Sequence, residues 1–206
     1  MKTSRAFLFA LICIFLYVGC SMKTGCKDLE NKTDSIDAID YQIYSLVLSE
    51  VQVKAKTFVV KQRILKVNFN SDNIYTEHLN ELFKQVFPEL SKTVLNNYKK
   101  ANSTTVSLEN KFDVSPKTIK LIPEEELDSI FSGQHLDENW YNFHAKYPDS
   151  NGLIRLSRIG YNSCRTEAIL GISISKSSEN AEGLILLLKK IDDVWKIIKI
   201  HQTWTS

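Results

Sequence analysis

The sequence predicts an α+β domain in which N-terminal helices pack against a C-terminal four-stranded antiparallel meander. Two observations lead to this fold class. Up to residue 147 the apolar residues recur mostly at helical spacing, whereas from residue 153 onward apolar and β-branched runs alternate with short polar segments. Polar segments of that length favour antiparallel neighbours, because a parallel pair of strands needs a longer crossover.

The first expected helix spans residues 34–51. Ile39, Ile43 and Val47 lie on one stripe of this segment, which predicts an amphipathic helix. Asp34 is the expected N-cap, because its carboxylate can accept hydrogen bonds from the first free backbone amides.

A strand and two further helices are expected next. Residues 57–67 are β-branched and apolar, which predicts a strand. The apolar stripe from Leu79 to Val86 predicts a helix that Pro88 ends, and a second short helix is expected to run to Tyr98.

The segment before the final strands contains a short strand and two helices. "KTIKLIP" (residues 117–123) predicts the strand, and Pro123 followed by three glutamates predicts a helix start. Acidic groups there are more often partners of the helix dipole than metal ligands. Residues 137–147 predict the second helix, and "YPDSNG" predicts the turn after it. The four expected strands are 153–161, 166–175, 184–191 and 194–204.

A helical half followed by a meander loosely resembles the cystatin-like and NTF2-like folds. Residues 34–206 suit one domain of this kind, and the sequence has no internal repeat. Residues 20–33 are polar and lack periodicity, which is typical of a tether.

The N-terminus is typical of an exported protein. Lys2 and Arg5 form a positive region, and an apolar run follows to Gly19. As a helix this run would span about 21 Å, which is short of a bilayer core of about 30 Å, so residues 1–19 are expected to be a signal peptide. "LYVGC" resembles the lipobox of bacterial lipoproteins, with Cys20 as the lipidated first residue of the mature chain.

The lipobox resemblance implies the cellular location. Several acyl chains on Cys20 would hold the protein stably at a membrane, since each buried methylene contributes about 0.8 kcal/mol. Ser21 stands where an Asp would favour the inner membrane, so the resemblance implies the outer membrane. The alternative is an ordinary secreted protein in which Cys20 is incidental.

Cysteine use and charge exclude several classes of protein. Cys13 leaves with the signal peptide and Cys20 would be lipidated, so Cys26 and Cys164 remain; whether they pair stays open. Without Lys2 and Arg5 the mature chain has equal numbers of basic and acidic residues, so no nucleic-acid partner is expected. No C-x-x-C or paired-histidine spacing is present, so no metal site or cofactor is expected.

The stretch "LSRIGYNSCRTEAILGISI" (156–174) invites a catalytic interpretation, but a β-hairpin explains it better. "RLSRIG" is not a G-x-S-x-G elbow, and no histidine partner for Cys164 can be identified. The weak catalytic candidates are His144, Tyr161, Arg155 and Glu167. Arg155 and Tyr161 are expected on the same strand face, and His144 shares a helix stripe with three aromatic residues.

Two tryptophans are the weak candidates for ligand binding, because rings stack on indoles, although such residues are more often core. They are Trp140, on the helix before the sheet, and Trp204, near the C-terminus. Trp195 and Trp204 have opposite strand parity, so one of the two is expected to be exposed.

The pattern "W..F...YP.SNG...LSRIGYN", followed by "LLLKK", "W.I" and a terminal "W.S", resembles a group of uncharacterised bacterial exported proteins, many of them lipoproteins. The resemblance covers about residues 138–206. That group often has a cysteine- and glycine-containing segment between the last strands, where this chain has "SKSSENAEG". The resemblance implies the fold and export, and it supplies no activity.

The sequence therefore favours a membrane-anchored lipoprotein with a non-catalytic binding or structural role. Its expected partners are the membrane, through the lipid, and an envelope protein or glycan. The alternatives are an envelope-tethered hydrolase and an immunity or inhibitor lipoprotein.

Overall fold

The computed structural model describes residues 35–51, 55–67 and 74–206. The helices are α1 (Ala38–Val51), α2 (Ile74–Val86), α3 (Lys92–Ala101), α4 (Glu124–Ile130) and α5 (Leu136–Lys146). The strands are β1 (Thr57–Lys61), β2 (Arg63–Ile64), β3 (Val106–Ser107), β4 (Thr118–Ile122), β5 (Ser150–Leu156), β6 (Gly160–Tyr161), β7 (Glu167–Ser175), β8 (Ala181–Ile191) and β9 (Val194–Thr205).

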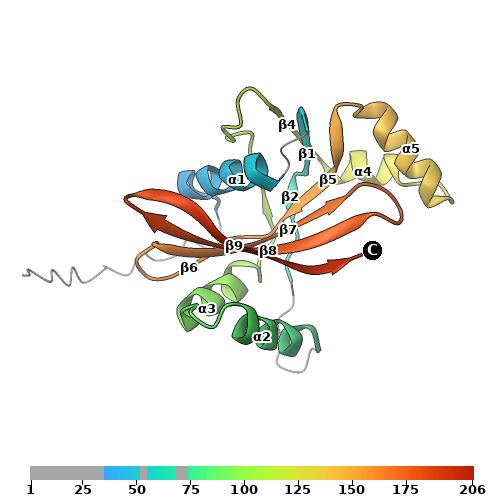
Figure 1. Cartoon of the computed structure of the whole chain (residues 1–206). Helices are drawn as coiled ribbons and strands as arrows, with labels where there is room; N and C mark the ends of the chain where they lie inside the picture. The colour runs from blue at the N-terminus through green and yellow to red at the C-terminus, as the bar shows by residue number, and fades with distance from the viewer. Residues whose placement is uncertain (1–34, 52–54, 68–73) are drawn as a thin grey trace, which may run out of the picture.

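One twisted sheet organises the domain. It has seven strands in the order β4-β1-β5-β7-β8-β9, with β6 paired to β7, and β2 and β3 form a separate two-stranded ribbon. Strand β1 runs parallel to β4 and β5, whereas the pairs from β5 to β9 are antiparallel. Figure 1 shows α1 on one side of the sheet, α2 and α3 on the other, and α4 and α5 at the β1–β5 end.

The α+β class is confirmed, but the sheet is not the four-stranded antiparallel meander that the sequence predicted. It is larger and mixed, because the expected strands 57–67 and 117–123 join it through β1 and β4. The segment 153–161 is also not one strand. It stops at Leu156 and pairing resumes at Gly160, which changes the side-chain direction between the two parts.

Helix α1 begins one turn later than expected, and Asp37 caps it instead of Asp34, which lies outside the described residues. The Asp37 carboxylate accepts the backbone N–H groups of Ile39 and Asp40, both at 3.0 Å. The Asp40 carboxylate accepts the N–H of Asp37 in return, at 3.0 Å. This reciprocal pair is a capping box.

The face of the sheet under α1 carries the main core. Tyr44, Val47 and Leu48 of α1 are fully buried against side chains of alternate positions on β7 and β8, such as Leu170 and Leu186. The alternation arises because successive strand residues point to opposite faces. The remaining positions of β5, β7 and β8 therefore face the other side.

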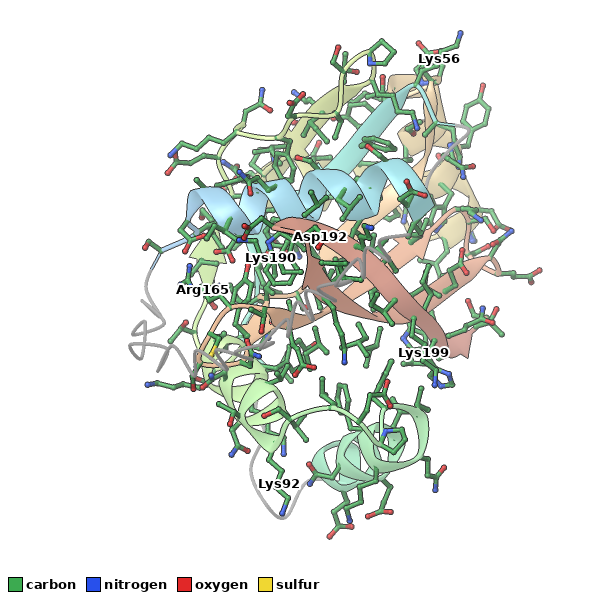
Figure 2. All side chains as sticks on the ribbon, turned by 60° about the vertical axis from the view of Figure 1, so that its left-hand side comes forward. Lys56, Lys92, Arg165, Lys190, Asp192 and Lys199 are labelled. Atoms are coloured by element: carbon green, nitrogen blue, oxygen red, sulfur yellow. The ribbon has the colours of Figure 1, made fainter. Side chains whose placement is uncertain are left out.

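That opposite face has two smaller cores, one at each end. Val59 and Leu153 pack under Trp140 and Phe143, with Ile130, from helices α5 and α4. At the other end, Ile169, Ile185 and Leu187 pack under α2 and α3, which meet at the turn after Pro88 as predicted. Figure 2 shows α1 and the α2–α3 pair separated by the sheet.

The tight turn between β8 and β9 was predicted correctly at "IDDV". Asp192 and Asp193 have φ values of 51° and 62°, which are left-handed conformations that Asp adopts more readily than most residues. This turn sets the register of β9, the last strand of the sheet.

Candidate ligand pocket

The centre of the face between the two smaller cores is left open by the helices. The residues that line it are Arg155 and Ser157 from β5 and its continuation, Gly171 and Ser173 from β7, and Gly183 from β8. Gly183 is buried, and Ser157, Gly171 and Ser173 are half-buried. Small and polar residues thus follow larger apolar ones along these strands, which creates a depression in the sheet surface.

The register of the sheet aligns four of the lining residues in one row. Arg155 pairs with Ser173, Ser173 with Gly183, and Gly183 with Trp204. With strands about 4.8 Å apart, the row extends about 14 Å across the sheet. It has a cation at one end, small side chains in the middle and an indole at the other end.

Glycine is required at position 183 because the indole of Trp204 lies directly on it. A Cβ at this position would be 2.1 Å from Trp204 Nε1. The hydroxyl of Thr203 donates to the Gly183 carbonyl at 3.0 Å and ties β9 to β8 at this point. Trp204 nevertheless remains 48% exposed, so one part of the ring is available for contact.

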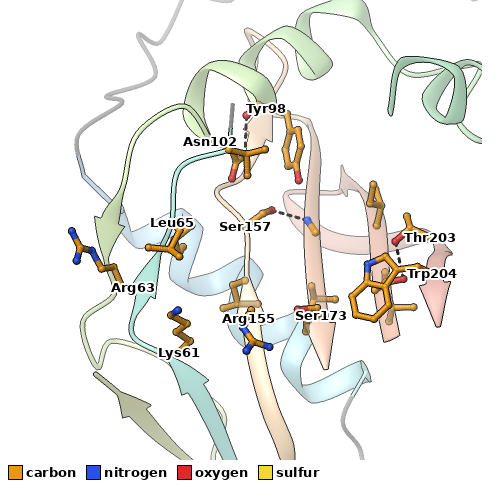
Figure 3. Close-up of a pocket in the computed structure, with 18 of the residues that line it drawn as sticks. Lys61, Arg63, Leu65, Tyr98, Asn102, Arg155, Ser157, Ser173, Thr203 and Trp204 are labelled. Atoms are coloured by element: carbon orange, nitrogen blue, oxygen red, sulfur yellow. Dashed lines mark hydrogen bonds between the residues drawn. The ribbon is translucent and has the colours of Figure 1, made fainter. Parts of the chain in front are cut away.

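These features line a pocket of about 470 Å³, which lies in the usual size range of small-molecule sites. Figure 3 shows Lys61 and Arg155 near one another at one end, Tyr98 and Asn102 at the opposite end, and Trp204 with Thr203 at the side. Apolar side chains complete the walls, among them Leu65, Leu82 and Ile185.

The cationic end has a net positive charge. Lys61 Nζ forms an ion pair with Glu124 Oε1 at 2.8 Å, whereas Arg63 and Arg155 form no ion pair within the described parts of the chain. Arg155 donates to the hydroxyl of Ser175 at 3.2 Å. Partial burial lowers the pKa of Arg155 and the charge of Glu124 opposes this effect, so the guanidinium stays protonated at neutral pH.

The described lining contains no histidine, cysteine or carboxylate side chain. The Ser157 hydroxyl accepts the N–H of Gly171 at 2.7 Å and donates to the Arg158 carbonyl at 2.9 Å. Both bonds hold the backbone where β5 ends, and no base is in contact with the oxygen. The hydroxyl of Ser157 thus has both of its hydrogen bonds with the backbone.

The four residues predicted as weak catalytic candidates are not brought together. His144 lies on α5, where its Nε2 is 2.7 Å from the Lys176 carbonyl and its ring contacts Trp140. Glu167 forms a cross-strand ion pair with Lys189 at 3.0 Å. Of the four, Arg155 alone lines the pocket.

The expectation that Arg155 and Tyr161 share a face is wrong, because the strand is interrupted between them. Arg155 lies in the pocket, whereas Tyr161 is buried in the core under α1 and contacts Trp195. Its hydroxyl donates to Asp40 Oδ1 at 2.7 Å.

The two tryptophans predicted as ligand contacts have different surroundings. Trp140, on α5, is buried in the small core between the sheet and helices α4 and α5, with its ring against Phe131 and Phe143. Trp204 lines the pocket, and Trp195 is buried on the opposite face, so the prediction that one of these two is exposed is confirmed. Lys61, Arg63 and the two glycines were missed, although "LGISIS" shows small residues at alternate positions.

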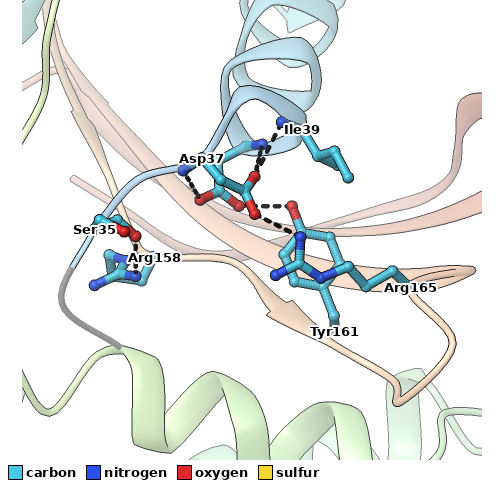
Figure 4. A network of polar contacts seen from close by, with 7 residues as sticks. Ser35, Asp37, Ile39, Arg158, Tyr161 and Arg165 are labelled. Carbon is cyan, nitrogen blue, oxygen red and sulfur yellow. Dashed lines mark hydrogen bonds and ion pairs between the residues drawn. The ribbon is translucent and has the colours of Figure 1, made fainter. Parts of the chain in front are cut away.

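A second polar cluster joins the start of α1 to the β6–β7 connection (Figure 4). Arg165 pairs with Asp37 at 2.5 Å and lies over the Tyr161 ring, 5.1 Å from its centroid. Arg158, which is buried, donates to the Ser35 carbonyl at 3.0 Å. Burial raises the pKa of Asp40, while the hydrogen bond from Tyr161 lowers it.

This cluster has a structural role. Asp40, Tyr161 and Arg158 are all buried, and none of them lines the pocket. Next to the cluster, Cys164 is disulfide-bonded. The other three cysteines, Cys13, Cys20 and Cys26, lie outside the described residues, so the predicted lipidation site does too.

Within residues 35–51, 55–67 and 74–206, no group of histidine, cysteine and acidic residues could hold a metal ion. None of the helices described there is long and apolar enough to cross a bilayer. No protein-family model matches the chain, and neither a curated protein nor a solved structure is significantly similar to it.

Proposed function

We propose that this chain is an exported lipoprotein, anchored through Cys20, whose domain binds a small ligand in the pocket without catalysing a reaction. The observation that carries the binding role is the pocket itself, with its cationic end, apolar walls and exposed indole. Pockets with apolar walls and a few convergent polar groups are the usual form of a small-molecule site. An open sheet face flanked by helices also supports the likeness to NTF2-like folds.

Two observations support export and the anchor. "LYVGC" has the glycine and cysteine expected around a lipoprotein cleavage site. Cys164 is disulfide-bonded, and such bonds persist in oxidising compartments outside the cytosol. If Cys13 is removed and Cys20 carries lipid, Cys26 is the cysteine that remains for Cys164.

The hydrolase alternative has less support. A hydrolase needs a base, an acid or an activated nucleophile around one cavity. His144, Tyr161 and Glu167 are all engaged in contacts away from the pocket.

A second candidate function, binding of an envelope protein as in an immunity or inhibitor lipoprotein, is favoured by strand β9. This strand is at the edge of the sheet, and Val194, Ile198 and Ile200 are 57%, 45% and 48% exposed. An exposed edge with apolar side chains can pair with an extended segment of another protein.

Filling the pocket is expected to remove the ligand. Ser173 lies at the middle of the row between Arg155 and Gly183, so Ser173→Trp places a large ring where the ligand would lie. Native mass spectrometry of protein gently extracted from its own membranes should show a non-covalent small molecule on the wild type and none on the variant.

The matched control is Ser129→Trp, which adds the same ring at an exposed position of α4 outside the pocket. It should keep the bound molecule. Thermal unfolding of both variants checks that the domain is folded. Equal occupancy in the wild type and in a folded Ser173→Trp variant, or none in either, would contradict the binding role.

A further inference from the structure

The ligand class can be inferred from the row Arg155–Ser173–Gly183–Trp204. We propose that the pocket takes a small anionic amphiphile, with its carboxylate or phosphate at Arg155 and its apolar body over Ser173, against the exposed part of the Trp204 ring. This inference rests on the proposed binding function and specifies the chemistry of its site.

The anionic head follows from the charges at one end of the pocket. Three lining side chains, Lys61, Arg63 and Arg155, are cations, and no described lining side chain is acidic. Glu124 neutralises Lys61, whose side chain is only 11% exposed. Arg155 is exposed, and among the described residues its guanidinium has one neutral hydrogen-bond partner, the Ser175 hydroxyl. Its remaining N–H groups can therefore bind a carboxylate or phosphate, which a guanidinium contacts through two parallel hydrogen bonds.

The apolar body follows from the rest of the row. Ser173 has a small side chain, so a ligand can lie close to the strand there, whereas the indole of Trp204 already covers Gly183. Beyond Ser173, the Trp204 ring and the side chains of Leu65, Leu82 and Ile185 offer apolar contact. An inorganic anion would leave this part of the pocket without a partner, and a neutral chain would leave Arg155 without one.

The length of the row limits the size of the ligand. Arg155 and Trp204 are on strands three positions apart, about 14 Å at the backbone. An extended ten-carbon chain with its head group has about this length, so the ligand is a short amphiphile of up to roughly ten carbons, not a whole phospholipid with two long chains.

The test uses the purified full-length protein and four ten-carbon probes that differ only in the head group: decanoate, decyl phosphate, decanol and decyltrimethylammonium. Binding is followed by calorimetry and by tryptophan fluorescence. Decanoate and decyl phosphate should bind at least tenfold more tightly than decanol, decyltrimethylammonium should not bind, and inorganic phosphate alone should bind much more weakly than decyl phosphate.

Two variants test the assigned contacts. Arg155→Gln should weaken decanoate binding by about tenfold, the usual effect of losing a charge-assisted hydrogen bond, and leave decanol binding unchanged. Lys92→Gln removes an exposed cation on α3, away from the pocket, and should change neither. Ser173→Trp should abolish binding of every probe.

The outcomes separate this inference from the proposed function. If decanol binds as tightly as decanoate, or if Arg155→Gln has no effect, the anionic class is wrong, while loss of binding in Ser173→Trp still supports a ligand pocket. If inorganic phosphate binds as tightly as decyl phosphate, the amphiphile is wrong and the site is a simple anion site. If no probe binds, the inference fails, and the occupancy of the natively extracted protein decides the proposed function by itself.

Discussion

Gly160→Ala is expected to destabilise the domain by about 3 kcal/mol or more, enough to unfold much of a marginally stable protein. Strand β6 passes directly under α3 at this residue. An added Cβ would be 2.4 Å from the Cβ, 2.5 Å from the Cα and 2.6 Å from the backbone nitrogen of Tyr98. Because two of these atoms belong to the helix backbone, α3 itself would have to move. Urea unfolding followed by circular dichroism measures the change.

Gly171→Ala is the matched control. Its added Cβ would be 3.2 Å from the Tyr98 hydroxyl and 3.5 Å from Ser157 Oγ, both of which are side-chain atoms that can shift. We expect it to change the unfolding free energy by less than about 1 kcal/mol. Equal losses in the two variants would show that α3 is not packed on β6 as described.

Tyr161→Phe is expected to lower the unfolding free energy by about 2 kcal/mol at pH 7, because it removes the hydroxyl that donates to the buried Asp40 carboxylate. Burial raises the pKa of Asp40 above its ordinary value of 3.8, and the Tyr161 hydrogen bond opposes that rise. The variant should therefore raise the pKa of Asp40 further.

The sign of the pH dependence follows from this raised pKa. At a pH between the pKa of Asp40 in the unfolded chain and its higher pKa in the folded protein, the folded protein binds more protons than the unfolded chain. The contribution of Asp40 therefore lowers the unfolding free energy as the pH rises through this range. The decrease in unfolding free energy caused by Tyr161→Phe should consequently become smaller as the pH falls from 7 towards about 4, where the Asp40 carboxylate becomes protonated.

Tyr44→Phe serves as the control for this pH effect. Its hydroxyl donates to the Ser157 carbonyl at 2.9 Å, a neutral acceptor, so its loss should depend little on pH. If the decrease in unfolding free energy caused by Tyr161→Phe is as independent of pH as that caused by Tyr44→Phe, Asp40 does not carry a charge that faces Tyr161.

Local patterns predicted most helices and strands, because each depends on neighbours in the sequence. The stripe of α1, the stop at Pro88 and the Asp192–Asp193 turn are all of this kind. The sheet could not be predicted in the same way. Strand β1 pairs with β4 and β5 across long connections, and no local pattern shows that these distant segments meet.

The pocket was predictable only in part for the same reason. Strand parity predicted that one of Trp195 and Trp204 is exposed, but not which one. The two irregularities in the β8–β9 register leave the two indoles on opposite faces of the sheet. Lys61 could not be connected with Arg155, because their proximity depends on β1 lying beside β5. The row that ends at Trp204 likewise depends on the register in which β5, β7, β8 and β9 pair, and no local sequence pattern predicts that register.

The most direct test of the account is the membrane fractionation of the full chain with Cys20→Ala, beside the wild type and Cys26→Ala. The wild type and Cys26→Ala are predicted to sediment with the membranes, because both keep the lipidated sulfur at position 20. The Cys20→Ala chain, exported to the same compartment, is predicted to remain in the soluble fraction. If Cys20→Ala sediments with the membranes as the wild type does, the protein is not held there by lipid on Cys20 and the account is contradicted.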